Sequence, residues 1–311
     1  MSGLALGQRS VEERAAELRA ARLPFVRATV VRVEPPTSAR PGDVGLVLGD
    51  GELDGFVGGQ CAEASVRLAA LERLAVGEPT LLRISPDAEP ERPGVANAHN
   101  PCLSGGAIEL FLEPVLPPPL LCVLGEGPIA RALSALGERA GFGLAAVALD
   151  GPVPADAAAL VVASHGRGEE AALRAALESG VPYIGLVASA RRGAAVLDAM
   201  NLCCSARSRI RTPAGLDLGA RTPQETAVSI LAQIIAERPR PALGADRRGP
   251  ADAPAPEPPE AAPTVAVDPV CAMSVAPGPH SLHARHGADT VWFCGPGCRD
   301  AFLAEPDRYR R

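Results

Sequence analysis

The sequence predicts an α/β protein with an N-terminal α+β domain, a Rossmann-like domain built on a parallel sheet, and a small metal-binding module at the C-terminus. Between residues 120 and 237, strand-like and helix-like segments alternate as they do in parallel sheets. A proline-rich stretch follows, and three cysteines lie beyond it in a segment too short to be stabilised by its core alone. We expect domains at 1–116 and 117–237, a linker at 238–266 and the module at 267–311.

Composition narrows the classes of function. All 30 basic residues among the 311 are arginine, which excludes a Schiff-base lysine and a Walker A phosphate loop. A net charge of -6 without a basic run argues against nucleic acid as a partner. The first 25 residues look like an amphipathic helix rather than a signal peptide, and no segment is long enough to span a membrane. We therefore expect a cytoplasmic protein whose eight cysteines are reduced.

The N-terminal domain is expected to begin with the amphipathic helix and an antiparallel sheet. A strand is predicted at 25–33, a hairpin at 46–57 that turns at Asp50-Gly51, and strands at 80–85 and 107–113, with a polar loop at 86–101. Between the hairpin and the strand at 80–85, apolar residues recur at helical spacing up to about Val76. Cys61 then falls in the first turn of that helix.

Two cysteines stand beside glycine pairs: Cys61 follows Gly58-Gly59, and Cys102 precedes Gly105-Gly106. A helix N-terminus stabilises anions and lowers the pKa of a nearby thiol, so Cys61 is a candidate nucleophile or metal ligand. A small buried cysteine is an equally good interpretation of its position. We expect both cysteines and their glycines to share one site, although their spacing is not that of a zinc site.

The Rossmann-like domain is expected to start with a strand at 120–124 that enters a glycine turn, Gly125-x-Gly127-x-x-Ala130, and a helix. Asp150, at the end of the next strand, stands about where a ribose-binding acid is expected. NAD(P) is therefore a possible ligand of Gly125, Gly127 and Asp150. Glu126 and Pro128 oppose it, because they add a negative charge and remove an N–H donor where a pyrophosphate would bind. A Rossmann fold that binds no nucleotide is the alternative.

Further strands are predicted at 144–150, 158–164 and 182–188, with a helix at 168–179. His165 follows the strand at 158–164, at the carboxyl edge where open α/β sheets bind ligands, and is the best-placed histidine for acid–base chemistry. A hydrogen-bonded structural histidine is the alternative. Thr222-Pro223-Gln224-Glu225 predicts a capping box at the start of a last helix ending near Glu237.

The C-terminal segment contains Cys271, Cys294 and Cys298. In a reducing compartment, so small a domain is expected to be stabilised by a metal that these cysteines bind. His280, His283 or His286 could provide a fourth ligand. Inert cysteines are the alternative.

Six short blocks of sequence follow one another along the chain: 57–63 (VGGQCAE), 102–106 (CLSGG), 109–114 (ELFLEP), 164–166 (SHG), 183–189 (YIGLVAS) and 215–220 (GLDLGA). Together, in this order, they resemble the XdhC/CoxI family over about residues 20–237. The resemblance implies an accessory protein that matures molybdenum hydroxylases, such as xanthine dehydrogenase and carbon monoxide dehydrogenase. Members bind molybdenum cofactor and assist its sulfuration and insertion. The tail is similar to a YHS domain, a treble-clef-like module, which implies a zinc or copper ion there.

These observations lead us to expect a maturation chaperone, more a non-catalytic factor than an enzyme. Its expected partners are a molybdenum hydroxylase client, a cysteine desulfurase and a second copy of the chain, and its cofactor is transiently bound molybdenum cofactor. Cys61 and Cys102 are expected to share a site with His165 between the first two domains. The alternatives are an NAD(P)-dependent oxidoreductase, from Gly125, Gly127 and Asp150, and a copper or zinc metallochaperone, from the tail.

Overall fold

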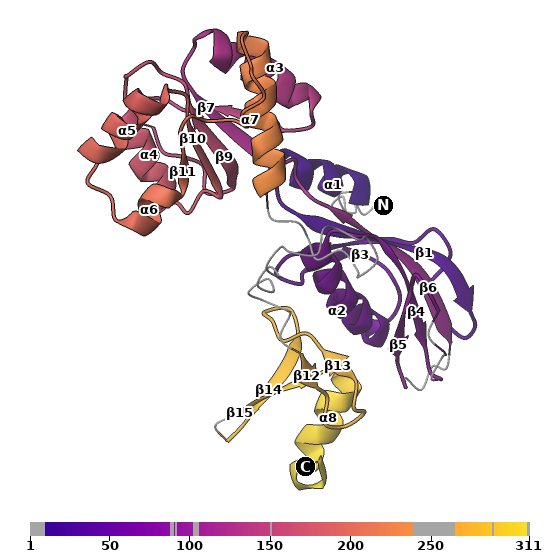
Figure 1. Ribbon diagram of the computed structural model, residues 1–311. Helices are drawn as coiled ribbons and strands as arrows, with labels where there is room; N and C mark the ends of the chain where they lie inside the picture. Colours follow the sequence, from indigo (N-terminus) through magenta and orange to yellow (C-terminus); the bar gives the residue numbers. More distant parts are fainter. Residues whose placement is uncertain are drawn as a thin grey trace, which may run out of the picture. The chain divides into compact units, whose positions relative to one another are not determined.

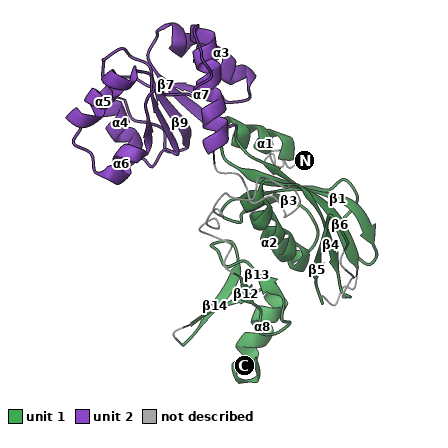
Figure 2. Cartoon of the chain, viewed as in Figure 1, with its two compact units in different colours: residues 1–117, 241–311 green, residues 118–240 purple. Residues whose placement is uncertain are grey.

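The structure is a computed structural model that describes residues 10–87, 90, 92–101, 106–149, 151–238, 265–287 and 289–309. Its contacts divide the chain into two units, residues 1–117 with 241–311 and residues 118–240 (Figure 2). The predicted domain bounds stay predictions, since the described residues stop at 238 and resume at 265.

The first unit contains a mixed six-stranded sheet (Figure 1). In spatial order its strands are β3 (Leu53–Gly55), β2 (Val44–Leu48), β1 (Phe25–Glu34), β6 (Ala107–Val115), β4 (Thr80–Ser85) and β5 (Val95–His99). Neighbouring strands are antiparallel except β4 and β5, which are parallel. The predicted loop at 86–101 was wrong in part, because it contains β5. This strand has a polar, weakly alternating sequence at the sheet edge, which gives no apolar pattern to detect.

Two helices cover opposite faces of this sheet because side chains alternate along β1. Val26 and its same-face neighbours pack with α2 (Gln60–Val76), whereas Phe25 packs with Leu46 and with α1 (Val11–Ala20). The predicted opening helix, the hairpin and the α2 helix are therefore confirmed. The turn between β2 and β3 contains Gly51 at φ +85°, a conformation that favours glycine.

The second unit is a parallel five-stranded sheet with helices on both faces. The strands are β11 (Ile210–Arg211), β10 (Tyr183–Leu186), β9 (Ala157–Val162), β7 (Leu120–Leu124) and β8 (Gly143–Ala146), in that order. Helices α3 (Pro128–Arg139) and α7 (Pro223–Glu237) pack on one face, and α4 (Glu169–Glu178) and α5 (Ala190–Ala199) on the other. The predicted Rossmann-like parallel sheet is confirmed.

Details of this unit differ from the prediction. All three later strands are shorter than expected, because residues 147–149, 163–164 and 187–188 form loops at the carboxyl edge instead. The sequence analysis also missed α5, β11 and the short helix α6 (Cys204–Ser208). The capping box is confirmed: Glu225 N donates to Thr222 Oγ1 at 3.2 Å, and Thr222 N donates to Glu225 Oε2 at 3.0 Å.

The C-terminal segment belongs to the first unit. It contains β12 (Ala266–Val267), β13 (Ser274–Val275), the hairpin of β14 (Leu282–His286) and β15 (Asp289–Phe293), helix α8 (Pro296–Ala304) and the 3-10 turn Pro306–Tyr309. Its small aromatic core centres on Phe302, whose ring lies 5.3 Å from that of Phe293. Across the parts of the chain described here, no helix combines the length and apolar character needed to cross a bilayer.

Candidate functional site

Three thiols and one carboxylate converge in the C-terminal segment. The Sγ of Cys294 lies 3.5 Å from that of Cys271 and 3.6 Å from that of Cys298. With Asp268, their potential ligand atoms all lie within 4.8 Å of one another. We call these four residues the cysteine cluster.

Local structure explains the convergence. Cys294 ends the β14–β15 hairpin, and Cys298 lies one turn later at the start of α8, where Pro296 occupies the first helical turn. Cys271 lies on a turn closed by Ala272 N donating to Asp268 O at 2.8 Å. Asp268 is fully buried, and its carboxylate accepts from the backbone N–H groups of Val270 at 2.9 Å and Cys294 at 2.8 Å. The carboxylate therefore joins the turn to the end of the hairpin.

The donor set fits a soft metal ion, because three sulfur ligands at this spacing suit Zn²⁺ or Cu⁺. The thiols also shift the pKa values of one another. The hydrogen bond with Cys294 lowers the pKa of Cys271 to about 7, whereas hydrogen bonds with Cys271 and then Cys61, together with burial, raise the pKa of Cys294. The Cys294 thiol thus stabilises the thiolate form of Cys271.

None of the three candidate histidines belongs to the cysteine cluster, so that part of the prediction was wrong. His283 packs on Trp292, with ring centroids 5.0 Å apart, and His286 packs edge-on against Phe302 at 5.5 Å. His280 instead lies 3.4 Å from Asp50 in the β2–β3 turn, measured from Nε2 to Oδ2. Aromatic packing holds His283 and His286 on β14, and the contact with Asp50 holds His280 at the β2–β3 turn.

Cys61 lies against the cysteine cluster. It is half-buried in the first turn of α2 and packs against the group of side chains that contains Cys294. The same sulfur lies 3.6 Å from the position that a Cβ on Gly295 would occupy. Around these thiols, Ala64 of α2 packs with Met273 and the other apolar atoms of the C-terminal segment. The sequence analysis had not connected Cys61 with these cysteines.

Cys61 also lines a pocket of about 540 Å³ in the N-terminal domain. We call it the α2 pocket. Its lining residues come from the loop after β1, the start of α2 and the adjacent ends of β4 and β6: Pro36, Thr37, Ser38, Gly59, Gln60, Cys61, Ala62, Ile84, Asn100, Gly106 and Ile108. Three predicted site residues, Gly59, Cys61 and Gly106, thus share one cavity. Cys102 and Gly105 lie outside the described residues.

Gly59 and Gly106, which line this pocket, and the neighbouring Gly58 serve different purposes. Gly59 is the N-cap of α2 and has no side chain to cap that helix end, and a Cβ there would meet nothing within 4 Å. The N-terminus of a helix favours negative charge, so this end of α2 suits an anion. Gly58 is buried at φ +130°, and a Cβ on Gly106 would lie 2.0 Å from Pro36 O. These two glycines are required by close packing.

The glycine turn of the Rossmann-like domain has the backbone conformation expected of it, but the side chain of His165 lies beside one of its glycines. Gly125 has φ +126°, and a Cβ there would lie 2.3 Å from Ala163 O. A Cβ on Gly127 would lie 2.9 Å from Nε2 of His165, so the imidazole occupies the space beside that glycine. A crevice of about 230 Å³ next to the turn is bordered by Gly125, Glu126 and Ser164. Asp150 lies outside the described residues.

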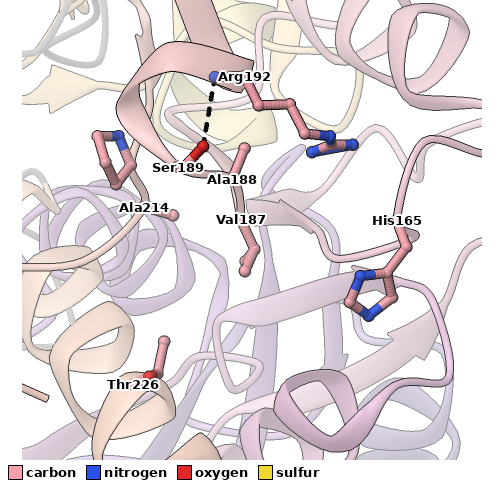
Figure 3. Close-up of a pocket in the computed structure, with 8 residues that line it drawn as sticks. His165, Val187, Ala188, Ser189, Arg192, Ala214 and Thr226 are labelled. Atoms are coloured by element: carbon pink, nitrogen blue, oxygen red, sulfur yellow. Dashed lines mark hydrogen bonds between the residues drawn. The ribbon is translucent and has the colours of Figure 1, made fainter. Parts of the chain in front are cut away.

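His165 itself is exposed and borders an open pocket of about 550 Å³ at the carboxyl edge of the sheet (Figure 3). The lining includes Ser189 and Arg192 at the start of α5 and Thr226 of α7. Buried Glu169 pairs with the Arg192 guanidinium and accepts from Gly166 N at 2.8 Å. This ion pair fixes the loop that bears His165. Sequence reasoning missed both partners, because Glu169 and Arg192 come from different helices with no shared motif.

Two family models match the chain: the XdhC and CoxI family over residues 18–85, and the XdhC Rossmann domain over residues 121–234. The chain belongs to the XdhC/CoxI family. The first match contains Gly58, Gly59 and Cys61, and the second contains the glycine turn and His165. Neither match reaches the cysteine cluster, so the likeness of the tail to a YHS domain stays a prediction.

The chain is also similar to two other proteins. "Uncharacterized protein YqeB" of Escherichia coli K12 is 27% identical over a 249-residue alignment that covers 71% of this chain and 45% of that protein. The chain thus spans less than half the length of that relative. A crystal structure described as a xanthine dehydrogenase from Bacillus halodurans shares 17% identity over 75% of this chain and 97% of that one, with a TM-score of 0.36.

Proposed function

We propose that this chain is a maturation factor for a molybdenum hydroxylase of the xanthine dehydrogenase or carbon monoxide dehydrogenase type. In this role it binds molybdenum cofactor transiently and assists its sulfuration and insertion. The observation that carries the proposal is the α2 pocket, in which an uncapped helix N-terminus and the Cys61 thiol line one cavity within a segment that matches the family.

The chemistry of the pocket suits this cofactor. Molybdenum cofactor carries a phosphate and a metal centre bound to sulfur. The N–H groups of the first turn of α2, opened by Gly58 and Gly59, would hold the phosphate. The Cys61 thiol, two residues after the N-cap, would approach the metal centre as a soft ligand. The pocket volume of about 540 Å³ is in the range of small-molecule sites.

Other predicted residues keep their roles within the proposal. Cys102 and Gly105 keep their predicted roles as a second thiol and a backbone contact, and Gly106 lines the pocket. His165 moves protons at the carboxyl edge of the Rossmann sheet, where its loop is fixed by Glu169 and Arg192. The factor prepares its client and needs no turnover of its own.

The partners follow from the same chemistry. The client is the apo form of the molybdenum hydroxylase, and a cysteine desulfurase supplies the sulfur for the cofactor. We propose that the factor acts as a homodimer in the cytoplasm, where its thiols stay reduced. Family membership is the support for the client.

A nucleotide-binding Rossmann unit is the second candidate, with NAD(P) as ligand. One observation favours it: among the described residues, the buried hydroxyl of Ser164 has no hydrogen-bond partner, and it borders the crevice beside Gly125. The imidazole of His165 beside Gly127 opposes it. Titration with NADH and NADPH separates the two: tight binding with turnover of a substrate in the absence of a client would favour an oxidoreductase.

Cofactor binding tests the proposal directly. Full-length protein is incubated with molybdenum cofactor released from a molybdenum enzyme, passed through a desalting column, and assayed for retained molybdenum. We expect the wild type and Cys203→Ser to retain the cofactor and Cys61→Ser to retain at least about tenfold less, because a soft ligand is lost. Cys203 is an exposed cysteine of the other unit. Equal retention by Cys61→Ser would remove Cys61 from the site.

A further inference from the structure

The cysteine cluster lacks a fourth soft donor among its own members. Tetrahedral sites for zinc need four ligands, and Cys271, Cys294 and Cys298 supply three. Asp268 is the nearby carboxylate, but its Oδ1 accepts from Val270 N and its Oδ2 accepts from Cys294 N. These two hydrogen bonds hold the turn and the hairpin together, which gives Asp268 a positioning role, and a carboxylate is a harder donor than a fourth thiolate.

We propose that Cys61 is the fourth ligand of this site, so that one soft metal ion bridges the N-terminal domain and the C-terminal segment. Cys61 packs against the group of side chains that contains Cys294, and its Sγ lies 3.6 Å from the position that a Cβ on Gly295 would occupy. Its Sγ stands outside the set of ligand atoms that all lie within 4.8 Å of one another, so metal binding must bring it closer to them. A four-thiolate site for Zn²⁺, with Cu⁺ as the alternative soft ion, would result. The thiols lose their protons as the metal binds.

Contacts around the thiols hold the N-terminal domain and the C-terminal segment together without any contribution from a metal. On α2, Ala64 and Ser65 lie three and four residues after Cys61, and thus on the same helical face. Ala64 packs against Met273 and Val275, and Ser65 borders a pocket shared with Met273 and Ser274. Further along the same boundary, His280 pairs with Asp50 at 3.4 Å. The site is thus part of a continuous packed boundary.

The bridging site has a regulatory consequence, and this consequence rests on the proposed function. Cys61 lines the α2 pocket and also borders the cysteine cluster. A thiolate bound to the tail metal is unavailable to molybdenum, so the two metals compete for one ligand. Occupancy of the tail site would then set how much factor can accept cofactor.

Thiol footprinting of the wild-type full chain tests the site without any substitution. Chelator-treated protein is pulsed with iodoacetamide with and without one equivalent of Zn²⁺, and each cysteine is quantified by peptide mass spectrometry. We expect Zn²⁺ to slow alkylation of Cys61 at least about tenfold, together with the three cluster cysteines, since a metal-bound thiolate is a poor nucleophile. Exposed Cys203 and Cys204 are the internal controls and should not change.

A second experiment measures the affinity of the protein for Zn²⁺ by competition with a chromophoric chelator. Cys61→Ser should weaken binding at least about tenfold, whereas Cys203→Ser should bind like the wild type. Asp268→Asn separates the two possible fourth ligands: it should leave the Zn²⁺ protection of Cys61 intact. The proposal is overturned if Zn²⁺ protects the three cluster cysteines but not Cys61, if Cys61→Ser binds as tightly as Cys203→Ser, or if Zn²⁺ does not bind. None of these outcomes depends on molybdenum cofactor, so the proposed function stands or fails separately.

Discussion

Nε2 of His165 lies 2.9 Å from the position that a Cβ on Gly127 would occupy. The glycine turn of the Rossmann unit is thus packed on one side by a side chain of the same unit, from the loop that follows β9. His165 has φ +54°, a conformation uncommon for residues other than glycine. The pairing of Glu169 with Arg192, and with Gly166 N, holds that loop in place.

The two glycines of this turn should therefore respond differently to alanine. Gly125→Ala places a Cβ 2.3 Å from Ala163 O in a left-handed conformation, and should lower the free energy of unfolding by about 2 kcal/mol or more. Gly127→Ala meets a side chain that can rotate, and its φ of -67° suits alanine, so its cost should stay below about 1 kcal/mol. Urea unfolding of both variants checks this, and equal losses would contradict it.

Cys122 is expected to be a structural thiol. It is fully buried at the centre of β7, in the aliphatic core under α4 and α5. Cys122→Ser buries a hydroxyl among apolar neighbours and should destabilise the fold by about 1 to 3 kcal/mol. Cys203→Ser, at an exposed site of the same unit, is the control and should shift the urea midpoint little. Similar midpoints for the two variants would show that the β7 interior tolerates a polar group.

The capping box of α7 predicts a dependence of stability on pH. Hydrogen bonds from the backbone N–H groups of Arg221 and Thr222 lower the pKa of Glu225 from 4.5. The ionised carboxylate therefore stabilises the fold above about pH 4.5, and this stabilisation is lost as the pH falls through the lower folded-state pKa. Unfolding of wild type and Glu225→Ala should differ at pH 7 and converge in acid. A stability difference between the two proteins that grows as the pH falls would contradict this prediction.

Substitution of Gly59 tests the α2 pocket without disturbing the packing around it. A Cβ at this N-cap would meet nothing within 4 Å, so Gly59→Ala should cost less than about 1 kcal/mol of stability. The methyl group would stand at the uncapped helix end and should weaken retention of molybdenum cofactor about tenfold. Gly49→Ala, at another open glycine of the same unit, is the control. Unchanged retention by Gly59→Ala would place the phosphate elsewhere.

Much of the fold could be predicted from the sequence, because its patterns are local. The buried strands β7 and β9 are continuous apolar runs, and the glycine turn and the Thr222 capping box have short signatures. The edge strand β5 escaped prediction because it is polar, and β11 because its two residues are too few to show a period.

The candidate site likewise contains residues that local sequence patterns predict and contacts that only the tertiary fold creates. Gly59 and Cys61 could be predicted, since a glycine pair before an apolar helix is visible in the sequence. The packing of Cys61 against the group of side chains that contains Cys294 could not, because it joins segments on either side of the whole Rossmann unit and no periodicity spans that distance. The pairing of Glu169 with Arg192 is likewise a product of the tertiary fold.

The proposed function requires Cys61 and Cys102, and the activity of a co-expressed client enzyme measures that requirement. A molybdenum hydroxylase of the xanthine dehydrogenase type is co-expressed with the wild type, with Cys61→Ser/Cys102→Ser, or with Cys203→Ser/Cys204→Ser. We predict that the first double variant lowers client activity at least about tenfold through loss of the soft ligands, with the client protein level and the Tm of the chelator-treated factor nearly unchanged. The second should match the wild type. Full client activity with Cys61 and Cys102 both replaced would contradict the account.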